Sequence, residues 1–356
     1  MGRIFFSSAA ITTEESNSDG HPDSKLGFSR AYSLALAPHI IYTRSSLLPL
    51  LVSSRSDQQL EFLAVGSWFV YTAGQNGTSA LLVRVPGSRE DLFADSSIEP
   101  RAKRSLMKFL RFVGDFENQS DWQDQANLPF HNFLSSRFNL PPAVQAPFSA
   151  LTLSPHPPGA TTVAFALPRV ARHLRSMGLF GPGFGAVVPK WGGLAEIAQV
   201  GCRAGAVGGA VYVLGTGLPG DTLQQEPATS TFAGKDESQP SGRTQLSLTN
   251  GDKVKTKCLA GSLAALPETA TFPTPSSSLV VSRCIAIISS PLKSLFPAMA
   301  EGAPQPAVAV VVFPSSKMDS VAQADDTAPI HLFVHSSETG ECPQGQCKLP
   351  RFPTVS

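Results

Sequence analysis

The clearest hydrophobic pattern in the chain predicts an amphipathic helix over residues 101–116. The apolar residues recur there at the spacing i, i+3, i+4, i+7, so they form one stripe along the helix. These residues are Leu106, Phe109, Leu110 and Val113. Mostly off that stripe lie the basic residues Lys103, Arg104, Lys108 and Arg111. We therefore expect a helix with a buried apolar side and a basic face, which is either solvated or docks an acidic partner.

Apolar runs at other places predict strands. Two β-rich runs, 60–71 and 80–86, flank an Asn-Gly pair at 76–77, a pattern typical of a hairpin. Later runs suit a mostly buried sheet, and they occupy 253–259, 278–288, 307–313 and 330–335. A further helix is predicted at 194–207 between short strands at 186–189 and 210–214. The fold class is α/β (α+β), with a helical module inserted into a sheet-rich domain.

Polar and low-complexity stretches suggest how the chain is divided. Residues 1–27 have no apolar period, and residues 221–250 are rich in Gln, Ser, Thr, Pro and Gly. The last residues close no recognisable element. The expected divisions are a disordered lead-in (1–27), a first domain I part (28–100), helical domain II (101–180), a domain I helix and strand (181–220), an insertion (221–250), the last domain I part (251–340) and an irregular tail (341–356).

Composition narrows the classes of protein. Of 356 residues, 42% are hydrophobic and 15% are charged, with a formal net charge of +1. Bulk charge therefore does not hold the chain to nucleic acid, and we expect no nucleic-acid partner. Apolar runs fall short of the ~20 residues of a membrane-spanning helix. Five scattered cysteines suggest reduced thiols, so the expected location is cytoplasmic.

The residues that could carry catalysis or bind a cofactor are poorly placed for it. His331 and His335 lie four apart in a predicted strand, where about 3.3 Å per residue separates them too far to share a metal ion. A phosphate-binding glycine loop must be followed directly by a helix. The glycine-rich segment 215–220 contains a proline and is followed by polar sequence instead. We expect no metal, no cofactor and no catalytic residues.

The predicted helix at 194–207 carries an unusual polar face. Glu196, Gln199 and Arg203 follow the spacing i, i+3, i+7 and project from the side opposite its apolar stripe. Glycines at 201, 205, 208 and 209 each lower helix propensity by about 1 kcal/mol relative to alanine. This cost suggests that they allow close packing. We expect the glycine-containing face of the helix to lie against a sheet. The polar face is either a solvated surface or a binding surface.

Three blocks in this chain resemble the superfamily of Rab GDP-dissociation inhibitors and Rab escort proteins. The block at 28–42 is similar to the family's Arg-x-(Phe/Trp)-Asn stretch, and the block at 103–113 is similar to its Lys-Phe-Leu helix. The signature around the second helix is matched by Pro189, Trp191, Gly192, Glu196, Ile197, Gln199, Arg203, Ala206, Gly209, Tyr212 and Leu214. The family's initial strand and glycine loop are not visible before Phe28, so this looks like a fragment.

The resemblance implies a flavoprotein-like domain I that binds no flavin, and a small helical domain II. It also implies a Rab-binding platform for GDP-bound Rab GTPases formed by Glu196, Gln199 and Arg203, with a geranylgeranyl tail sheltered between the helices of domain II.

Escort proteins are favoured within the family. They are non-catalytic accessory components that present Rab to the Rab geranylgeranyltransferase heterodimer and carry it to membranes, with transient membrane contact. His173 falls near an aromatic position that they use against the transferase. The alternatives are a flavin-dependent amine-oxidase-like oxidoreductase and an inactive truncated product.

Overall fold

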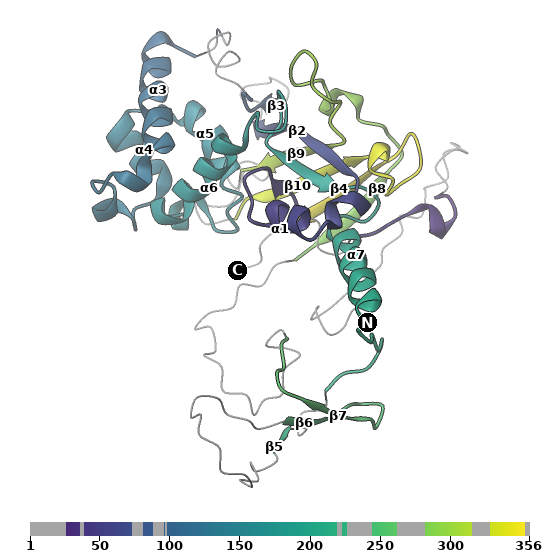
Figure 1. Cartoon of the computed structure of the whole chain (residues 1–356). Coiled ribbons are helices and arrows are strands. Elements are labelled where there is room, and N and C mark those ends of the chain that lie inside the picture. Colours follow the sequence, from purple (N-terminus) through teal and green to yellow (C-terminus); the bar gives the residue numbers. More distant parts are fainter. Residues whose placement is uncertain are drawn as a thin grey trace, which may run out of the picture. The chain divides into compact units, whose positions relative to one another are not determined.

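The computed structural model describes residues 26–35, 39–72, 81–87, 96, 98–218, 223–225, 244–261, 282–314 and 328–352. The chain divides into two compact units (Figure 1). The first comprises residues 1–21 and 205–278, and the second comprises 22–204 and 279–356. The second unit holds the large sheet and a group of helices.

Eight described strands form the sheet of the second unit, in the order β1-β4-β2-β9-β10-β11-β8, with β3 paired to β2. Their bounds are β1 Ile41–Tyr42, β2 Phe62–Thr72, β3 Leu81–Arg84, β4 Ala186–Pro189, β8 Cys284–Ile288, β9 Val308–Phe313, β10 Ile330–Ser336 and β11 Cys347–Phe352. The pairs are antiparallel except for β2 with β9. The β2–β3 pair confirms the predicted antiparallel partners, and the Asn-Gly pair at 76–77 lies outside the described residues.

Strand β9 lies in the middle of the sheet and is buried on both faces. Its even-numbered residues Val308, Val310 and Val312 join one hydrophobic cluster, and Ala309 and Val311 join another on the opposite face. A strand covered on both faces reads as a continuous apolar run, because its alternating side chains all meet apolar neighbours. The prediction of a buried strand at 307–313 is confirmed.

Four helices form a module, hereafter the helical module, beside this sheet (Figure 1). They are α3 Pro100–Gly114, α4 Phe130–Phe138, α5 Pro142–Leu151 and α6 Val163–Ser176. Phe109 is fully buried, and its ring lies 5.1 Å from that of Phe148 and 5.3 Å from that of Phe138. The predicted stripe of α3 is confirmed in Leu106, Phe109 and Val113, since all three are buried.

Shorter elements complete the second unit. Helix α1 (Leu47–Ser53) and the start of helix α7 (Leu194–Val207) pack against β1, β2 and β4, and the last residues of α7, 205–207, belong to the first unit (Figure 1). The 3-10 turns are η2 Ser29–Ala31, η3 Ser56–Gln59, η4 Phe116–Asn118, η5 Gln123–Gln125, η6 Pro158–Ala160, η7 Lys293–Leu295 and η8 Ser337–Thr339. The first unit holds a three-stranded sheet, β5 Leu223–Gln225, β6 Thr244–Ser247 and β7 Lys253–Thr256.

Three predictions about individual strands are wrong. Residues 347–352 form strand β11 instead of an irregular tail, because β10 and β8 on either side supply its backbone hydrogen bonds. Residues 210–214 form no strand, and their side chains are exposed. Strand β7 pairs with β6 in the small sheet, so the run at 253–259 is not part of the large one.

Candidate functional site

Helix α7 carries the predicted polar face and is held to the sheet by its first two turns. Leu194 and Ile197 pack against an apolar cluster, and Val200 is buried. That cluster contains Ile41, Leu48, Leu51, Ala64, Phe184 and Val187. The apolar stripe therefore faces inward at the start of the helix, which leaves the opposite face open.

The structure places Glu196, Gln199 and Arg203 together on that open face. Gln199 Nε2 donates a hydrogen bond to Glu196 Oε1 at 3.4 Å, and Arg203 Nη1 donates to Gln59 Oε1 in η3, also at 3.4 Å. Gln199 and Arg203 are exposed and Glu196 is half-buried. Within the described part of the chain, neither charged group has an ion-pair partner. A carboxylate, an amide and a guanidinium are thus presented side by side to an incoming polar surface.

The expectation that the glycines of α7 lie against a sheet is wrong. A β-carbon built on Gly201 would meet no atom within 4 Å, so this position is open. At Gly205 the missing side chain makes room for a tyrosine instead, because a β-carbon would lie 2.2 Å from the Tyr212 hydroxyl. The glycines therefore leave the end of α7 thin and exposed rather than packed against strands.

The turn before α7 rests on the loop after β10. Trp191 N donates a hydrogen bond to Thr339 O at 2.7 Å, and the Trp191 ring covers Gly340. Gly340 has a φ of +74°, and a β-carbon there would lie 2.3 Å from the Trp191 ring, so only glycine fits both the backbone and the space. The indole is still 54% exposed, which places an aromatic surface beside the polar face.

A buried charged network fixes the same loop to residues 26–35, which include the first part of the block at 28–42. Lys348 Nζ donates to Glu341 Oε1 at 2.7 Å and to Ser33 O at 3.1 Å, and Ser33 N donates to Glu341 O at 3.0 Å. His335 Nδ1 and Glu341 Oε2 form a further short contact. Burial raises the pKa of Glu341, but His335 and Lys348 together hold that pKa below its usual value.

This network brings three segments that are distant in sequence to one place. Glu341 is 2% exposed and Lys348 is fully buried, so they form a buried ion pair that links these segments. Gly192 lies between the segments, since a β-carbon there would be 2.9 Å from Glu196 Oε1 and 3.7 Å from Ser33 Oγ. Sequence reasoning missed Glu341 and Lys348, because charged residues near a chain end carry no local sign of burial.

A cavity of about 1610 Å³ lies between part of the sheet and the helical module. It lies between β2 and β3 on one side and α3, α5 and α6 on the other. Among its apolar lining residues are Val70, Val83, Leu106, Leu110, Phe148 and Leu151. This is an apolar space of the kind that holds small ligands, and it adjoins His173.

His173 is buried against the wall of this cavity. Its ring makes edge-to-face contacts with Trp68 at 4.9 Å and Tyr42 at 5.8 Å, and its Nδ1 has no hydrogen-bond partner. Burial lowers the pKa of His173 to about 4, so the imidazole is neutral near pH 7. A side chain buried in this way is not available for direct contact with a transferase, so the prediction for His173 is wrong.

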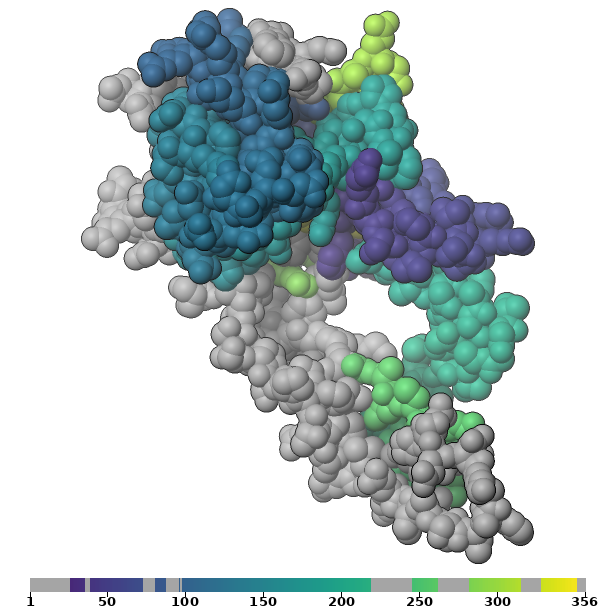
Figure 2. All heavy atoms as spheres, turned by 60° about the vertical axis from the view of Figure 1, so that its left-hand side comes forward, coloured from purple at the N-terminus to yellow at the C-terminus, as the bar shows by residue number. Residues whose placement is uncertain are grey.

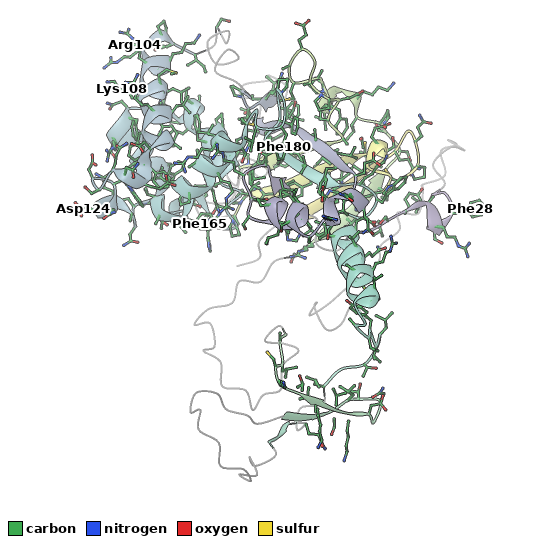
Figure 3. The ribbon with its side chains drawn as sticks, in the orientation of Figure 1. Phe28, Arg104, Lys108, Asp124, Phe165 and Phe180 are labelled. Carbon is green, nitrogen blue, oxygen red and sulfur yellow. The ribbon has the colours of Figure 1, made fainter. Side chains whose placement is uncertain are left out.

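The basic face of α3 is on the outside of the helical module. Arg104 and Lys108 are exposed and point away from the sheet, whereas Lys103 is half-buried (Figure 3). Among the described residues, no group of three or more His, Cys, Asp or Glu side chains is arranged to hold a metal ion. No helix in the described part of the chain has the length and apolar character needed to cross a membrane.

The fold is that of a Rab GDP dissociation inhibitor. The crystal structure of the Rab GDI of Plasmodium falciparum matches this chain with a TM-score of 0.64 at 17% sequence identity, over 95% of this chain and 70% of that one. The likeness shows the architecture that the resemblance predicted.

Sequence comparisons then identify the family. The family model described as GDP dissociation inhibitor matches residues 10–226, which is more than half of the chain, so the protein belongs to the GDP dissociation inhibitor family. The "Rab proteins geranylgeranyltransferase component A" of Saccharomyces cerevisiae is 28% identical over 89% of this chain and 47% of its own length. The protein of the same name from Candida albicans is 33% identical over 53% of this chain and 29% of its own length. The chain spans about half, or less, of the length of these relatives.

Proposed function

We propose that this protein is a non-catalytic carrier of Rab GTPases of the escort type. It binds GDP-bound Rab through the polar face of α7, presents Rab to the geranylgeranyltransferase heterodimer and carries the prenylated product to membranes. Family membership and relatives named as transferase component A support this proposal over a flavin-dependent oxidoreductase. The relatives' name describes a component of a Rab geranylgeranyltransferase, which supports a role in Rab prenylation.

The observation that carries the proposal is the arrangement of α7. Glu196, Gln199 and Arg203 share one face of the helix. Neither the Glu196 carboxylate nor the Arg203 guanidinium forms an ion pair within the described residues. Trp191 lies beside them with half of its surface exposed. Aromatic and arginine side chains supply much of the affinity of protein interfaces, so this combination fits a protein partner.

The cavity supports the lipid part of the proposal. Burial of an isoprenoid contributes about 0.8 kcal/mol per CH₂ group, so a geranylgeranyl chain needs an extended apolar enclosure. The apolar walls between the sheet and the helical module provide such an enclosure within one unit of the chain. We propose that the prenyl tail of the bound GTPase is sheltered here, against the inner side of α3 and α5.

The test measures binding of the purified chain to a Rab GTPase loaded with GDP. Hydrogen bonds to charged groups contribute about 1.5–3 kcal/mol, so we expect Glu196→Ala and Arg203→Ala each to weaken binding at least about tenfold. Asp124→Ala and Arg172→Ala, which remove one acid and one base from exposed positions of the helical module, should leave affinity unchanged. Equal affinity of all four variants and the unmodified chain would refute the assignment of the polar face.

A further inference from the structure

Helix α3 carries a row of cations along its outer face. Arg101, Arg104, Lys108 and Arg111 follow the spacing i, i+3, i+7, i+10, which keeps them on one side of the helix over about 15 Å. All four are exposed, and the helix contains no acidic residue. Figure 2, which brings the helical module forward, shows it without other described elements covering its outer side.

These cations have no carboxylate partners in the part of the chain that the structure describes. Two ion pairs of the helical module lie away from this row: Arg137 with Asp121 and Arg175 with Glu117. Arg104 Nε donates only to the backbone, at Pro100 O. A positive row on a chain whose net charge is only +1 is a local feature, which bulk charge does not explain.

The cation row adjoins the apolar cavity. Met107 and Arg111 line the cavity between α3 and the sheet, and they also line a shallow depression on the basic face. The opposite wall is formed in part by β3, whose Val83 lines the cavity and is 45% exposed. The cation row and exposed apolar surface are therefore linked through this cavity, because exposed Arg111 and exposed Val83 both line it.

We infer that the outer face of α3 docks on an anionic phospholipid bilayer. Clusters of Lys and Arg are attracted to the negative surface of lipid headgroups, and exposed apolar side chains beside them suit the headgroup boundary. An acidic protein would satisfy the charges equally well, but protein interfaces concentrate their energy in buried aromatic anchors. The exposed positions of α3 offer Arg and Lys with no aromatic side chain, which favours the bilayer.

This docking would direct the cavity toward the membrane, so that a lipid tail could leave it without crossing water. The inference goes beyond the proposed GTPase binding, because it assigns a second surface on another helix. Its test contains no GTPase and no isoprenoid, so its failure would leave the assignment of α7 intact.

The experiment is flotation of the purified full chain with vesicles of phosphatidylcholine alone, or with about 30% phosphatidylserine, at low and high salt. We expect binding only to the anionic vesicles, and weaker binding in high salt. Arg104→Gln with Lys108→Gln should lower the partition coefficient by about 25-fold, at about fivefold for each cation removed. The matched control is Arg55→Gln with Lys293→Gln, which removes the same charge from exposed sites outside the helical module and should retain binding.

Three results would overturn the inference. The first is equal binding of the chain to neutral and anionic vesicles. The second is an equal loss of binding in both double variants. The third is that the unmodified chain binds no anionic vesicles. The last result would leave the basic face to an acidic protein partner.

Discussion

His173 makes the stability of the second unit depend on pH in a defined direction. The imidazole is buried between Trp68 and Tyr42, and its Nδ1 has no hydrogen-bond partner to stabilise a proton. Burial lowers its pKa from 6.5 to about 4 in the folded chain. The unfolded chain exposes the same imidazole to water, where its pKa is the ordinary value.

The sign and size of the effect follow from these two pKa values. Between pH 6.5 and 4 the unfolded chain binds a proton at His173 that the folded chain does not, so the free energy of unfolding falls as the pH falls through this window. The contribution is fully present above the unfolded pKa. Integrated from pH 7 to pH 5, the loss attributable to His173 is about 2 kcal/mol.

The assay is urea unfolding at pH 7 and at pH 5, followed by tryptophan fluorescence. The three tryptophans, Trp68, Trp122 and Trp191, all lie in the second unit, so the signal reports that unit. We expect His173→Phe, which keeps an aromatic ring against Trp68, to lose about 2 kcal/mol less than the unmodified chain between the two pH values.

The control separates this site from other titrating groups. His331 is also buried, and burial lowers its pKa, but it is present in both proteins and cancels in the difference. If His173→Phe and the unmodified chain lost equal stability from pH 7 to pH 5, the argument from the buried, unpartnered imidazole would be wrong.

Two further predictions concern the cavity and the charged network. Ala146→Trp, at the cavity wall, should weaken binding of a fluorescent geranylgeranyl probe at least about tenfold, because the larger side chain fills the space. Ala164→Trp, on the exposed side of α6, should leave probe binding unchanged. Equal probe binding by the two variants would exclude the cavity as the lipid site. Glu341→Gln should lower the free energy of unfolding by about 3–5 kcal/mol in chemical denaturation, because it leaves the buried Lys348 charge uncompensated. Exposed Glu338→Gln is the control there, and a similar small change in both variants would argue against a structural role for the network.

Local patterns determined much of the helical module and of the site on α7. The spacing of apolar residues was enough to predict α3 and its buried stripe, because a helix brings residues three and four apart to one side. The same rule predicted that Glu196, Gln199 and Arg203 share a face, and the structure has a continuous helix over these positions. Whether that face binds a Rab GTPase stays a prediction.

Tertiary structure decided the features that depend on neighbours distant in sequence. Strand β11 forms because β8 and β10 lie on either side of it, and its own residues end in a Pro-containing stretch that gives no strand pattern. His173 is buried because Tyr42 and Trp68 from other elements enclose it. Glu341 and Lys348 form a buried ion pair only where Ser33 contacts the loop after β10. The burial of a charged side chain depends on its partners in space rather than on its neighbours in the sequence.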